Sequence, residues 1–577
     1  ALKIVADLAN RGVIVGEELL SRMGSVMLAR QKGVVKRAAK LLARHGSADA
    51  AIGAAIDGLV HPAPDVQTVL LDVIDARMVG ASDPEALRRR LAGQRELLAP
   101  SLRDRLPPGQ ASPGAPVDEG RRRAPAPFSE DRRLTPVEGI DAALAQVTHA
   151  LENPLDTDGF ELALDAMHRH RERLADWGQR CGPLRKHARR ILRRDGLYDD
   201  GLRALTAYVA LTWCNGELEE WPAPNDFGNV TYQFLVGRCR SLAARIARQD
   251  VRPLLSIATH RGGWIEPEVF SERIAAYAGA KVEPHDALLA LMRVPSAARA
   301  QARRKLDAQG GVPRGLLELA EKPPAIQYTF SVGALYPGAD PKWRRLWARV
   351  EPPAPKPKRS LELRRELHSF HECEGHGITW TRDVKRWRAT ATPDDLAGYY
   401  AHGAIRLAGF DFDSADNHAE PLRASLIAGS SFGVEGHWLL LLALASRGRE
   451  AIDLGLDVAI EGIATARVSP QALGEVLGQL LPTGLLKGKR LATTLGTLAE
   501  ASVLHRRTVL ALLQRGLRGD PDASPRDVAA LLSLLYELLV AEETTLTDPE
   551  ARRWLENSTR GGRVAKLKKK LLEPQSV

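Results

Sequence analysis

Helical periodicity is clearest in the segment EAIDLGLDVAIEGIATARVSPQALGEVLGQLL, which runs from Glu450 to Leu481. Its first half carries apolar residues at the spacing of one face of an α-helix, namely Ile452, Leu456, Ala459, Ile460 and Ile463. A second helix is expected from Ser469 and Pro470, because serine caps helix N-termini and proline fits the first helical position. Its apolar face consists of Leu473, Val476, Leu477 and Leu480. The segment therefore predicts a helical hairpin.

This hairpin is one of a series between Glu435 and Leu546. The first helices of successive hairpins begin near residues 450, 487 and 525. The resulting period of roughly 37 residues lies between the tetratricopeptide and HEAT/armadillo lengths. Near the N-terminus, the apolar face within residues 34–42 recurs roughly 32 residues later, within 66–74. We therefore expect an all-α fold, an α-α superhelix of the HEAT/armadillo-like solenoid type, in two or three lobes joined by proline-rich linkers.

Composition limits the class of protein. A chain of 577 residues exceeds the size of one hydrophobic core, and 5 % aromatic residues suit stacked helices better than sheets. The cysteines are widely separated and form no C-x-x-C motif, so neither a disulfide framework nor a cysteine zinc site is expected. The sequence shows neither an apolar run of about 18 residues nor a signal peptide, which predicts a soluble, cytoplasmic protein. The net charge of +10 favours anionic partners.

Two proline-rich segments divide the chain. The expected order is an N-terminal HEAT-like block, a flexible linker, a central helical domain, a proline-rich linker, a helical connector and a C-terminal HEAT-like solenoid, over residues 1–106, 107–136, 137–350, 351–360, 361–434 and 435–577. The chain opens with Ala1 in a helical pattern, so we expect the first block to be truncated. Within the central domain, Tyr328–Val332 predicts a strand without an obvious mate, and Trp343–Trp347 predicts a helix.

A dense row of cations occupies one predicted helix of the central domain. Two adjacent i, i+4 rows share one helix face, and they comprise Arg185, Lys186, Arg189, Arg190, Arg193 and Arg194. One interpretation is a solvated face partly paired with acids such as Asp195, Asp199 and Asp200. The other is an anion-binding surface for a phosphate backbone or an acidic protein. Binding of a nucleic acid requires that the rows face open solvent.

The least repeat-like stretch is ATHRGGWIEP, from Ala258 to Pro267. The paired glycines indicate unusual backbone angles, and Glu266 followed by Pro267 indicates the start of a helix. Two interpretations stay open for its central side chains, which are Thr259, His260, Arg261 and Trp264. They form a small recognition pocket for a partner. Alternatively they are structural, with the histidine capping the preceding helix and the tryptophan filling a seam between hairpins.

One cluster has the chemistry of metal ligands, and it comprises His368, His371, Glu372, Cys373, Glu374 and His376. The zincin motif places two histidines four residues apart so that they share a helix face. Here His371 and His376 are five residues apart, and on a helix they diverge. We therefore expect no bound metal and no cofactor.

Three stretches together resemble a known group of proteins. They are Ala258–Pro267 with the following Glu-Arg pair, RWRATATP at Arg386–Pro393, and the helical array from His437 to Val540. They resemble a bacterial HEAT-repeat family of unknown function, typically encoded beside MoxR-type AAA+ ATPases, von Willebrand A-domain proteins and SWIM zinc-finger proteins. The usual proline before the Thr-His pair is Ala258 here. The resemblance implies a HEAT architecture without an established active site, and an AAA+ ATPase and an A-domain protein as partners in a chaperone-like system.

We accordingly expect a non-enzymatic scaffold or adaptor, because stacked hairpins present long surfaces to protein partners. Neither a G-x-x-x-x-G-K-[ST] loop nor a G-x-G-x-x-G turn occurs in a strand–helix context, so the chain is not expected to be an ATPase itself. A nucleic-acid-binding helical solenoid that uses basic helix faces is the alternative. A metal-dependent hydrolase built on the histidine cluster is the remote one.

Overall fold

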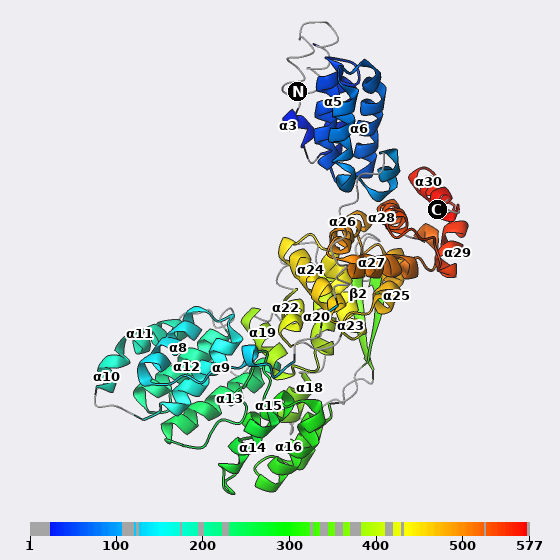
Figure 1. The fold of residues 1–577 in the computed structure, drawn as a ribbon. Helices are drawn as coiled ribbons and strands as arrows, with labels where there is room; N and C mark the ends of the chain where they lie inside the picture. Colours follow the sequence, from blue (N-terminus) through cyan, green and yellow to red (C-terminus); the bar gives the residue numbers. More distant parts are fainter. Residues whose placement is uncertain are drawn as a thin grey trace. The chain divides into compact units, whose positions relative to one another are not determined.

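The computed structural model describes residues 8, 24–29, 31–106, 121–122, 126–172, 176–193, 201–221, 230–323, 327–334, 344–351, 362–369, 382–409, 419–428, 432–523 and 527–573. Within these residues the fold is all-α, as predicted, with a single two-stranded hairpin as the exception (Figure 1). The described residues include no helix that is both long enough and apolar enough to cross a membrane. The chain divides into two compact units, which comprise residues 1–118, 532–548 and 560–577 in the first, and 119–531 and 549–559 in the second.

The first unit contains a short helical repeat array. Its elements are α3 (Gly24–Met27), α4 (Lys32–Leu42), α5 (Ala48–Asp57), η1 (Gly58–Val60), α6 (Pro64–Arg77), η2 (Met78–Gly80), α7 (Pro84–Ala92), η3 (Arg95–Leu97), η4 (Pro100–Arg105), most of α28 (Val528–Ala541) and α30 (Arg563–Leu572). Ion pairs join positions 33 residues apart in successive repeats, and they are Lys32–Asp65, Asp57–Arg90 and Asp72–Arg105. This spacing agrees with the apolar period predicted for the segment.

The second unit begins with the central helices. They are η5 (Glu130–Arg132), α8 (Ile140–Glu152), α9 (Thr157–Arg169), α10 (Trp177–Arg180), α11 (Gly182–Leu192), α12 (Gly201–Asn215), α13 (Val230–Ala247), α14 (Pro267–Ala275), α15 (Pro284–Arg293), α16 (Ser296–Gln309) and α17 (Arg314–Glu321). Helices α8, α9, α11 and α12 lie side by side in the cyan part of Figure 1. Their core is extended by α18 (Glu362–Ser369) and α19 (Arg382–Ala391), through Leu367 and Trp387. The segment expected to connect two lobes thus partly belongs to the central core.

The hairpin consists of β1 (Gln327–Ala334) and β2 (Arg344–Glu351), which pair antiparallel. The strand expected near Tyr328 therefore exists, but the helix predicted for Trp343–Trp347 is wrong. Strand alternation explains the error, because Leu346 and Ala348 lie opposite Val332 and Phe330 in the register and give the hairpin an apolar face. Phe330 stacks on Trp438 with ring centroids 4.8 Å apart, and β2 contacts the helix that spans Ala397–Gly409.

The C-terminal helices of the second unit form two rows. They are α20 (Ala397–Gly409), α22 (Glu420–Ala428), α23 (Val434–Leu444), α24 (Arg449–Ala464), α25 (Pro470–Leu480), η6 (Leu481–Thr483), α26 (Gly488–Ala499), α27 (Val503–Gly516), η7 (Pro521–Ala523) and α29 (Pro549–Asn557). Helices α22, α24 and α26 contact one another in succession, and so do α23, α25 and α27. Contacts between every second helix are what a stack of hairpins requires.

Helix α25 agrees with its prediction, whereas the buried face of α24 differs. The α25 helix begins with the Ser469 hydroxyl accepting the Ala472 N–H at 3.3 Å, and its predicted apolar face is buried. In α24, three of the five predicted core residues are only half-buried, namely Ile452, Leu456 and Ile460. The helix instead buries Leu454, Val458 and Ile463 together with small residues, which include Ala451, Gly455, Ala459 and Gly462. Small residues let α24 approach α23 closely, since a Cβ on Gly455 would lie 3.4 Å from that of Ala443.

The predicted linkers are described only in part. Most of residues 107–125 and all of 352–361 lie outside the described residues. The Arg122 N–H donates to the Ala464 carbonyl at 2.8 Å. Residues 126–136, at the end of the first predicted linker, pack against the Thr-His-Arg-Gly-Gly-Trp loop.

Candidate functional site

The Thr-His-Arg-Gly-Gly-Trp loop closes on itself between α13 and α14. The N–H groups of Thr259 and His260 both donate to the Trp264 carbonyl, at 2.8 and 3.1 Å. The Thr259 hydroxyl accepts the Glu266 N–H at 2.9 Å and lies 2.9 Å from His260 Nδ1. These bonds satisfy the Thr259 hydroxyl and the N–H groups of Thr259, His260 and Glu266, whereas His260 Nε2 is buried without a hydrogen-bond partner among the described residues. Local backbone geometry therefore accounts for the threonine.

The end of the predicted linker covers this loop. The Leu134 N–H donates to the Thr259 carbonyl at 2.8 Å, and the Arg261 N–H donates to the Arg132 carbonyl at 2.8 Å. Phe128 meets the His260 ring edge to face, with centroids 5.2 Å apart. Burial lowers the pKa of His260, so the imidazole is neutral near pH 7. Residues 126–136 are thus part of this domain.

The structure does not present the four predicted loop residues as a solvent-facing pocket. Thr259, His260 and Trp264 are at most 8 % exposed, and only Arg261 is exposed. The loop is therefore a structural element for three of the four residues. The structural alternative expected His260 to cap the preceding helix, but the histidine lies beside the Thr259 hydroxyl instead. Trp264 is buried, as that alternative expected.

A buried charge network lies beneath the loop. The Glu161 carboxylate of α9 accepts two hydrogen bonds from Arg238, at 2.8 and 2.6 Å, and one from Arg293 at 3.0 Å. The Trp387 indole N–H donates to the same carboxylate at 2.9 Å. Burial opposes ionisation of Glu161, but the two arginines outweigh burial and hold its pKa well below the usual range. The network therefore carries one net positive charge in the interior.

This network joins the loop to α19. Arg293 Nε donates to the Thr390 carbonyl at 2.9 Å, and its Nη1 donates to the Ser256 carbonyl at 2.6 Å. Gly263 lies against the same Thr390 carbonyl. Two of the stretches on which the resemblance rests, Ala258–Pro267 and Arg386–Pro393, therefore meet in space. Sequence reasoning did not predict this meeting.

One carboxyl beside the loop has a raised pKa. Burial raises the pKa of Asp158 to about 6, and the neighbouring charge of Asp156 acts in the same direction. The charge of Arg261 and a hydrogen bond from the Gly262 N–H oppose this rise. Asp158 thus titrates in the physiological range, but its contacts hold the loop rather than form a cleft.

The basic rows lie on α11 and face solvent. Lys186, Arg189, Arg190 and Arg193 are exposed, and none of them forms an ion pair with a residue that the structure describes. Arg185 is half-buried and donates to the Cys214 carbonyl at 3.3 Å. Arg194 lies outside the described residues, as do the expected acidic partners Asp195, Asp199 and Asp200. We call the four exposed cations the α11 surface.

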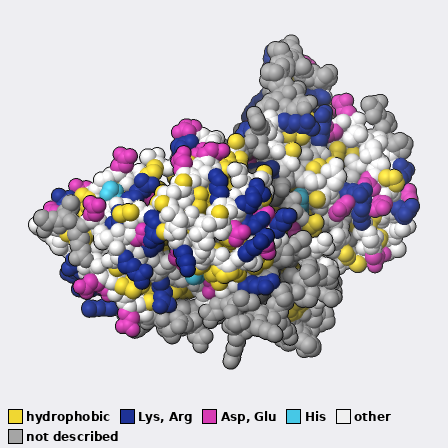
Figure 2. All heavy atoms as spheres, turned by 90° about the horizontal axis from the view of Figure 1, so that it is seen from below, with side chains coloured by type: hydrophobic (Ala, Val, Ile, Leu, Met, Phe, Trp, Pro, Cys, Tyr) yellow, Lys and Arg dark blue, Asp and Glu magenta, His cyan; other side chains and the backbone are white. Residues whose placement is uncertain are grey.

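A second basic cluster, around Glu420 and Glu450, has its arginines in ion pairs with these acids. Arg382 Nε lies 2.5 Å and Arg386 Nε 2.6 Å from the carboxylate of Glu420, which is fully buried. Arg423 lies 2.9 Å from the Glu450 carboxylate. On the face drawn in Figure 2, groups of Lys and Arg side chains are likewise interspersed with Asp and Glu. The α11 surface differs because none of its cations forms an ion pair with a described residue.

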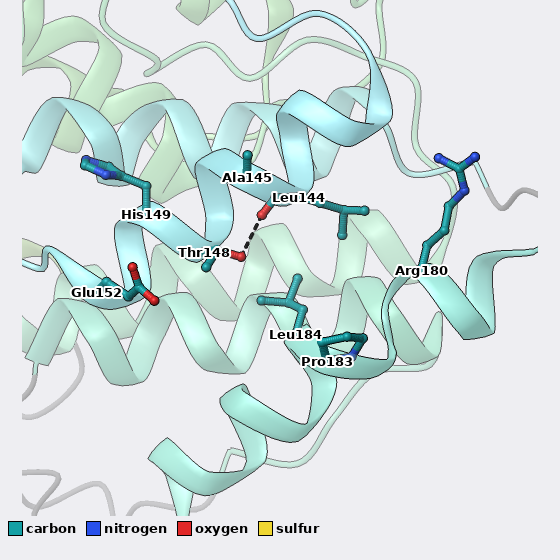
Figure 3. Close-up of a pocket in the computed structure, with 8 residues that line it drawn as sticks. All are labelled: Leu144, Ala145, Thr148, His149, Glu152, Arg180, Pro183 and Leu184. Carbon is teal, nitrogen blue, oxygen red and sulfur yellow. Dashed lines mark hydrogen bonds between the residues drawn. The ribbon is translucent and has the colours of Figure 1, made fainter.

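An open groove of about 380 Å³ runs between α8 and α11 beside this surface (Figure 3). It is lined by Leu144, Ala145, Thr148, His149, Glu152, Arg180, Pro183 and Leu184. In Figure 3 the apolar side chains lie along its middle, Arg180 lies at one end, and His149 and Glu152 lie at the other. The Thr148 hydroxyl is occupied, because it donates to the Leu144 carbonyl at 2.9 Å. The middle of the groove is therefore apolar.

Helix geometry brings the groove and the cations together. Pro183 lines the groove, and Lys186 and Arg190 follow it by three and seven residues on the same helix face. Burial lowers the pKa of His187, and the charge of Arg190 lowers it further. The imidazole is therefore neutral near pH 7, and the lasting positive charge beside the groove comes from the lysine and arginines. The sequence indicated the cations but gave no sign of the groove.

The metal-ligand cluster is not described. His371, Cys373 and His376 lie outside the described residues, and nothing is placed for the His368 side chain. Elsewhere in the described part of the chain, no group of three or more His, Cys, Asp or Glu side chains is arranged to hold a metal ion.

Two regions of the chain match known families. Residues 129–351 match a family described as Domain of unknown function (DUF7824), and residues 343–573 match a second, described as Domain of unknown function (DUF7825). No curated protein and no solved structure matches the chain. Strand β2 belongs to both matched regions, so the boundary between them falls in the hairpin.

Proposed function

We propose that this chain is a non-enzymatic scaffold or adaptor that presents the faces of helical hairpins to protein partners. One observation carries the proposal. The α11 surface combines exposed cations, unpaired among the described residues, with an adjoining groove whose middle is apolar. Surface cations without partners cost little in stability, and they are available to attract an anionic partner.

The groove favours a protein over a nucleic acid as the occupant. A phosphate backbone is bound by cations and hydrogen-bond donors, and it gains nothing from an apolar floor. An acidic protein segment gains from both, because apolar side chains fill the groove while its carboxylates face the cations. The proposed occupant is therefore an acidic segment that carries apolar side chains.

The family resemblance supplies candidate partners. It implies a MoxR-type AAA+ ATPase and a von Willebrand A-domain protein, in a chaperone-like system of the cytoplasm. The two rows formed by α22 to α27 support the further proposal that the array is a HEAT-like superhelix.

A specific observation also favours the nucleic-acid alternative. Exposure of Arg189, Arg190 and Arg193 meets the condition that a phosphate-binding surface must face solvent. We rank this alternative second because a phosphate backbone would bind to the cations alone, and the apolar groove would contribute nothing to its binding.

The proposal is tested by biolayer interferometry with the purified full chain and two purified proteins of the kinds that the resemblance implies, a MoxR-type AAA+ ATPase and a von Willebrand A-domain protein from the same organism. We expect micromolar or tighter binding of at least one of them, and its loss in the double variant Lys186→Glu, Arg190→Glu. A control with the same charge change, Arg304→Glu with Lys322→Glu, reverses two exposed cations away from the groove and should bind normally. Failure of both proteins to bind would contradict the scaffold proposal. Equal binding by the two double variants would contradict the assignment to the α11 surface.

A further inference from the structure

Three arginines surround two carboxylates where α22 packs against α19 and α24. The carboxylate of Glu420, the first residue of α22, accepts hydrogen bonds from Arg382 Nε at 2.5 Å and from Arg386 Nε and Nη2 at 2.6 and 3.1 Å. The carboxylate of Glu450, in the first turn of α24, accepts one from Arg382 Nη2 at 2.5 Å and one from Arg423 Nη2 at 2.9 Å. We call these five residues the Glu420 cluster. It shares no residue with the α11 surface or with its groove.

The Glu420 cluster has more positive than negative charge. Among the described residues, no acid outside the cluster forms an ion pair with any of its arginines, so three positive charges face two negative ones. Lys385 follows Arg382 by three residues on α19, a spacing that places both on the same side of the helix. Lys385 is 8 % exposed and forms neither a hydrogen bond nor an ion pair with a described residue. The cluster and this lysine together therefore have more positive charge than their acids neutralise.

Two of the arginines keep N–H groups without an acceptor in the described part of the chain. A guanidinium carries five N–H donors on three nitrogens. Arg423 bonds to Glu450 through Nη2 alone, and its buried Nε makes no hydrogen bond, because it lies 3.6 Å from the Glu420 carboxylate. Arg382 uses Nε and Nη2, which leaves Nη1. The side chains of Arg382 and Arg423 are 30 % and 36 % exposed, so an anion reaches them from solvent.

We propose that the Glu420 cluster binds a phosphate monoester group, to which Arg382 on α19 and Arg423 on α22 donate. A phosphate monoester carries close to two negative charges near neutral pH and has three strong acceptor oxygens. It therefore matches both the excess charge and the spare donors. A carboxylate brings a single charge and two oxygens, and so does a phosphodiester. The inference does not depend on the α11 surface or on its proposed partner.

The acids of the cluster fix the donors before a ligand binds. Burial opposes ionisation of Glu420, but Arg386 and Arg382 outweigh burial and lower its pKa. All three nitrogens of Arg386 are occupied, since Nη1 donates to the Leu155 carbonyl at 3.2 Å, so this arginine positions Glu420 and leaves the ligand to the other two. Side chains that are already held in place lose little freedom when an anion binds.

Lys385 adds charge to the same side of α19. Burial lowers its pKa to about 8, and the charges of Arg406 and Arg382 act in the same direction, whereas the charge of Glu420 opposes them. The ammonium is therefore still mostly protonated near pH 7. Its repulsion from the neighbouring arginines is relieved when a dianion binds between them.

The experiment is isothermal titration calorimetry of the full chain, slightly above neutral pH and at physiological ionic strength. The probes are inorganic phosphate, dimethyl phosphate, and a short glycine-rich peptide with one phosphoserine. We expect inorganic phosphate to bind about ten-fold or more tightly than dimethyl phosphate, which carries one charge. The peptide identifies the source of the group. Tighter binding of the peptide than of inorganic phosphate indicates a phosphorylated side chain, and weaker binding indicates a small free phosphate.

Variants locate the site. Arg423→Gln should weaken the binding of inorganic phosphate about ten-fold or more. The matched control Arg314→Gln removes an arginine from the exposed pair with Glu318 and should bind as the parent chain does. The triple variant Arg189→Ala, Arg190→Ala, Arg193→Ala should also bind normally, because the α11 surface is a different site. Circular dichroism checks folding, and Arg423→Lys, which keeps the charge but has no guanidinium, replaces Arg423→Gln with the same expectation if the latter does not fold.

Three results would overturn the proposal. The first is that neither inorganic phosphate nor the phosphoserine peptide binds. The second is equal affinity for inorganic phosphate and dimethyl phosphate, since any exposed cation would then suffice. The third is a wrong location, seen either as equal effects of the Arg423 and Arg314 variants or as loss of phosphate binding in the triple variant of α11.

Discussion

Gly263 lies against the backbone carbonyl of Thr390, so close that a Cβ on this residue would come within 1.9 Å of the carbonyl oxygen. The φ angle of Gly263 is +93°, a conformation that L-residues with side chains rarely adopt. Arg293 donates to the same carbonyl at 2.9 Å. The loop and the end of α19 thus form one joint, and its tightness depends on the absence of a side chain.

Gly263→Ala should therefore destabilise the central domain. The positive φ and the clash with backbone atoms act together, so we expect a loss of about 3 kcal/mol or more, seen as a lower Tm in thermal unfolding followed by circular dichroism. Gly315→Ala is the matched control, because this exposed glycine lies inside α17 with no atom near its Cβ position. It should leave Tm unchanged or raise it slightly. Equal effects of the two changes would contradict the tight joint.

The buried Glu161 network predicts that two Glu→Gln variants differ strongly in stability. Glu161→Gln keeps the shape of the side chain but leaves Arg238 and Arg293 without a buried counter-charge, which should cost about 3–5 kcal/mol in unfolding free energy. Glu318→Gln removes an acid from the exposed pair with Arg314 and should cost at most about 0.5 kcal/mol. Urea unfolding of both variants measures the difference. A mild effect of Glu161→Gln would show that the arginines find other partners.

His285 gives the fold a pH dependence of known sign. Burial disfavours its protonation, but hydrogen bonds and charges of Glu283 and Glu366 outweigh burial and raise its pKa from 6.5 to about 9. Because the folded-state pKa is the higher one, protonated His285 stabilises the fold fully below pH 6.5, and this contribution is lost as pH rises through about 9.

His285→Gln should therefore lower Tm most below pH 6.5 and least above about pH 9. Glutamine cannot be protonated, so the difference in unfolding free energy at the lower pH should be about 3 kcal/mol. Thermal unfolding of both proteins across this range checks the expectation. A difference that stays constant with pH would mean that His285 does not bear the charge.

The sequence predicted the fold where periodicity is carried by large residues. The buried face of α25 could be predicted because leucine and valine recur there at helical spacing, and its start could be predicted from the cap residue Ser469. In α24 the same rule failed in part, because the helix buries Leu454 and Val458 with several alanines and glycines, and it leaves Ile452, Leu456 and Ile460 half-buried. The strand β2 was read as a helix because two tryptophans four residues apart fit one helical turn as well as alternate strand positions.

The sites were predictable only where a single helix carries them. The α11 surface follows from i, i+4 spacing within one segment, whereas its groove needs the packing of α8 against α11. The Glu161 network was missed because Glu161 and Asp165 lie four residues apart on α9, a spacing that is typical of a solvated face. Its partners come from α13, α15 and α19, and no local pattern brings these together.

Fluorescence anisotropy with two labelled peptides and a short DNA duplex tests the α11 surface most directly. One peptide is acidic and contains leucines, and the other has the same charge with glycine in place of each leucine. The account predicts that the full chain binds the leucine peptide at micromolar or tighter affinity, binds the glycine peptide about ten-fold or more weakly, and loses both in Arg189→Ala, Arg190→Ala, Arg193→Ala. Equal affinity for the two peptides, or tighter binding of the duplex with a steep salt dependence that the triple variant removes, would contradict it.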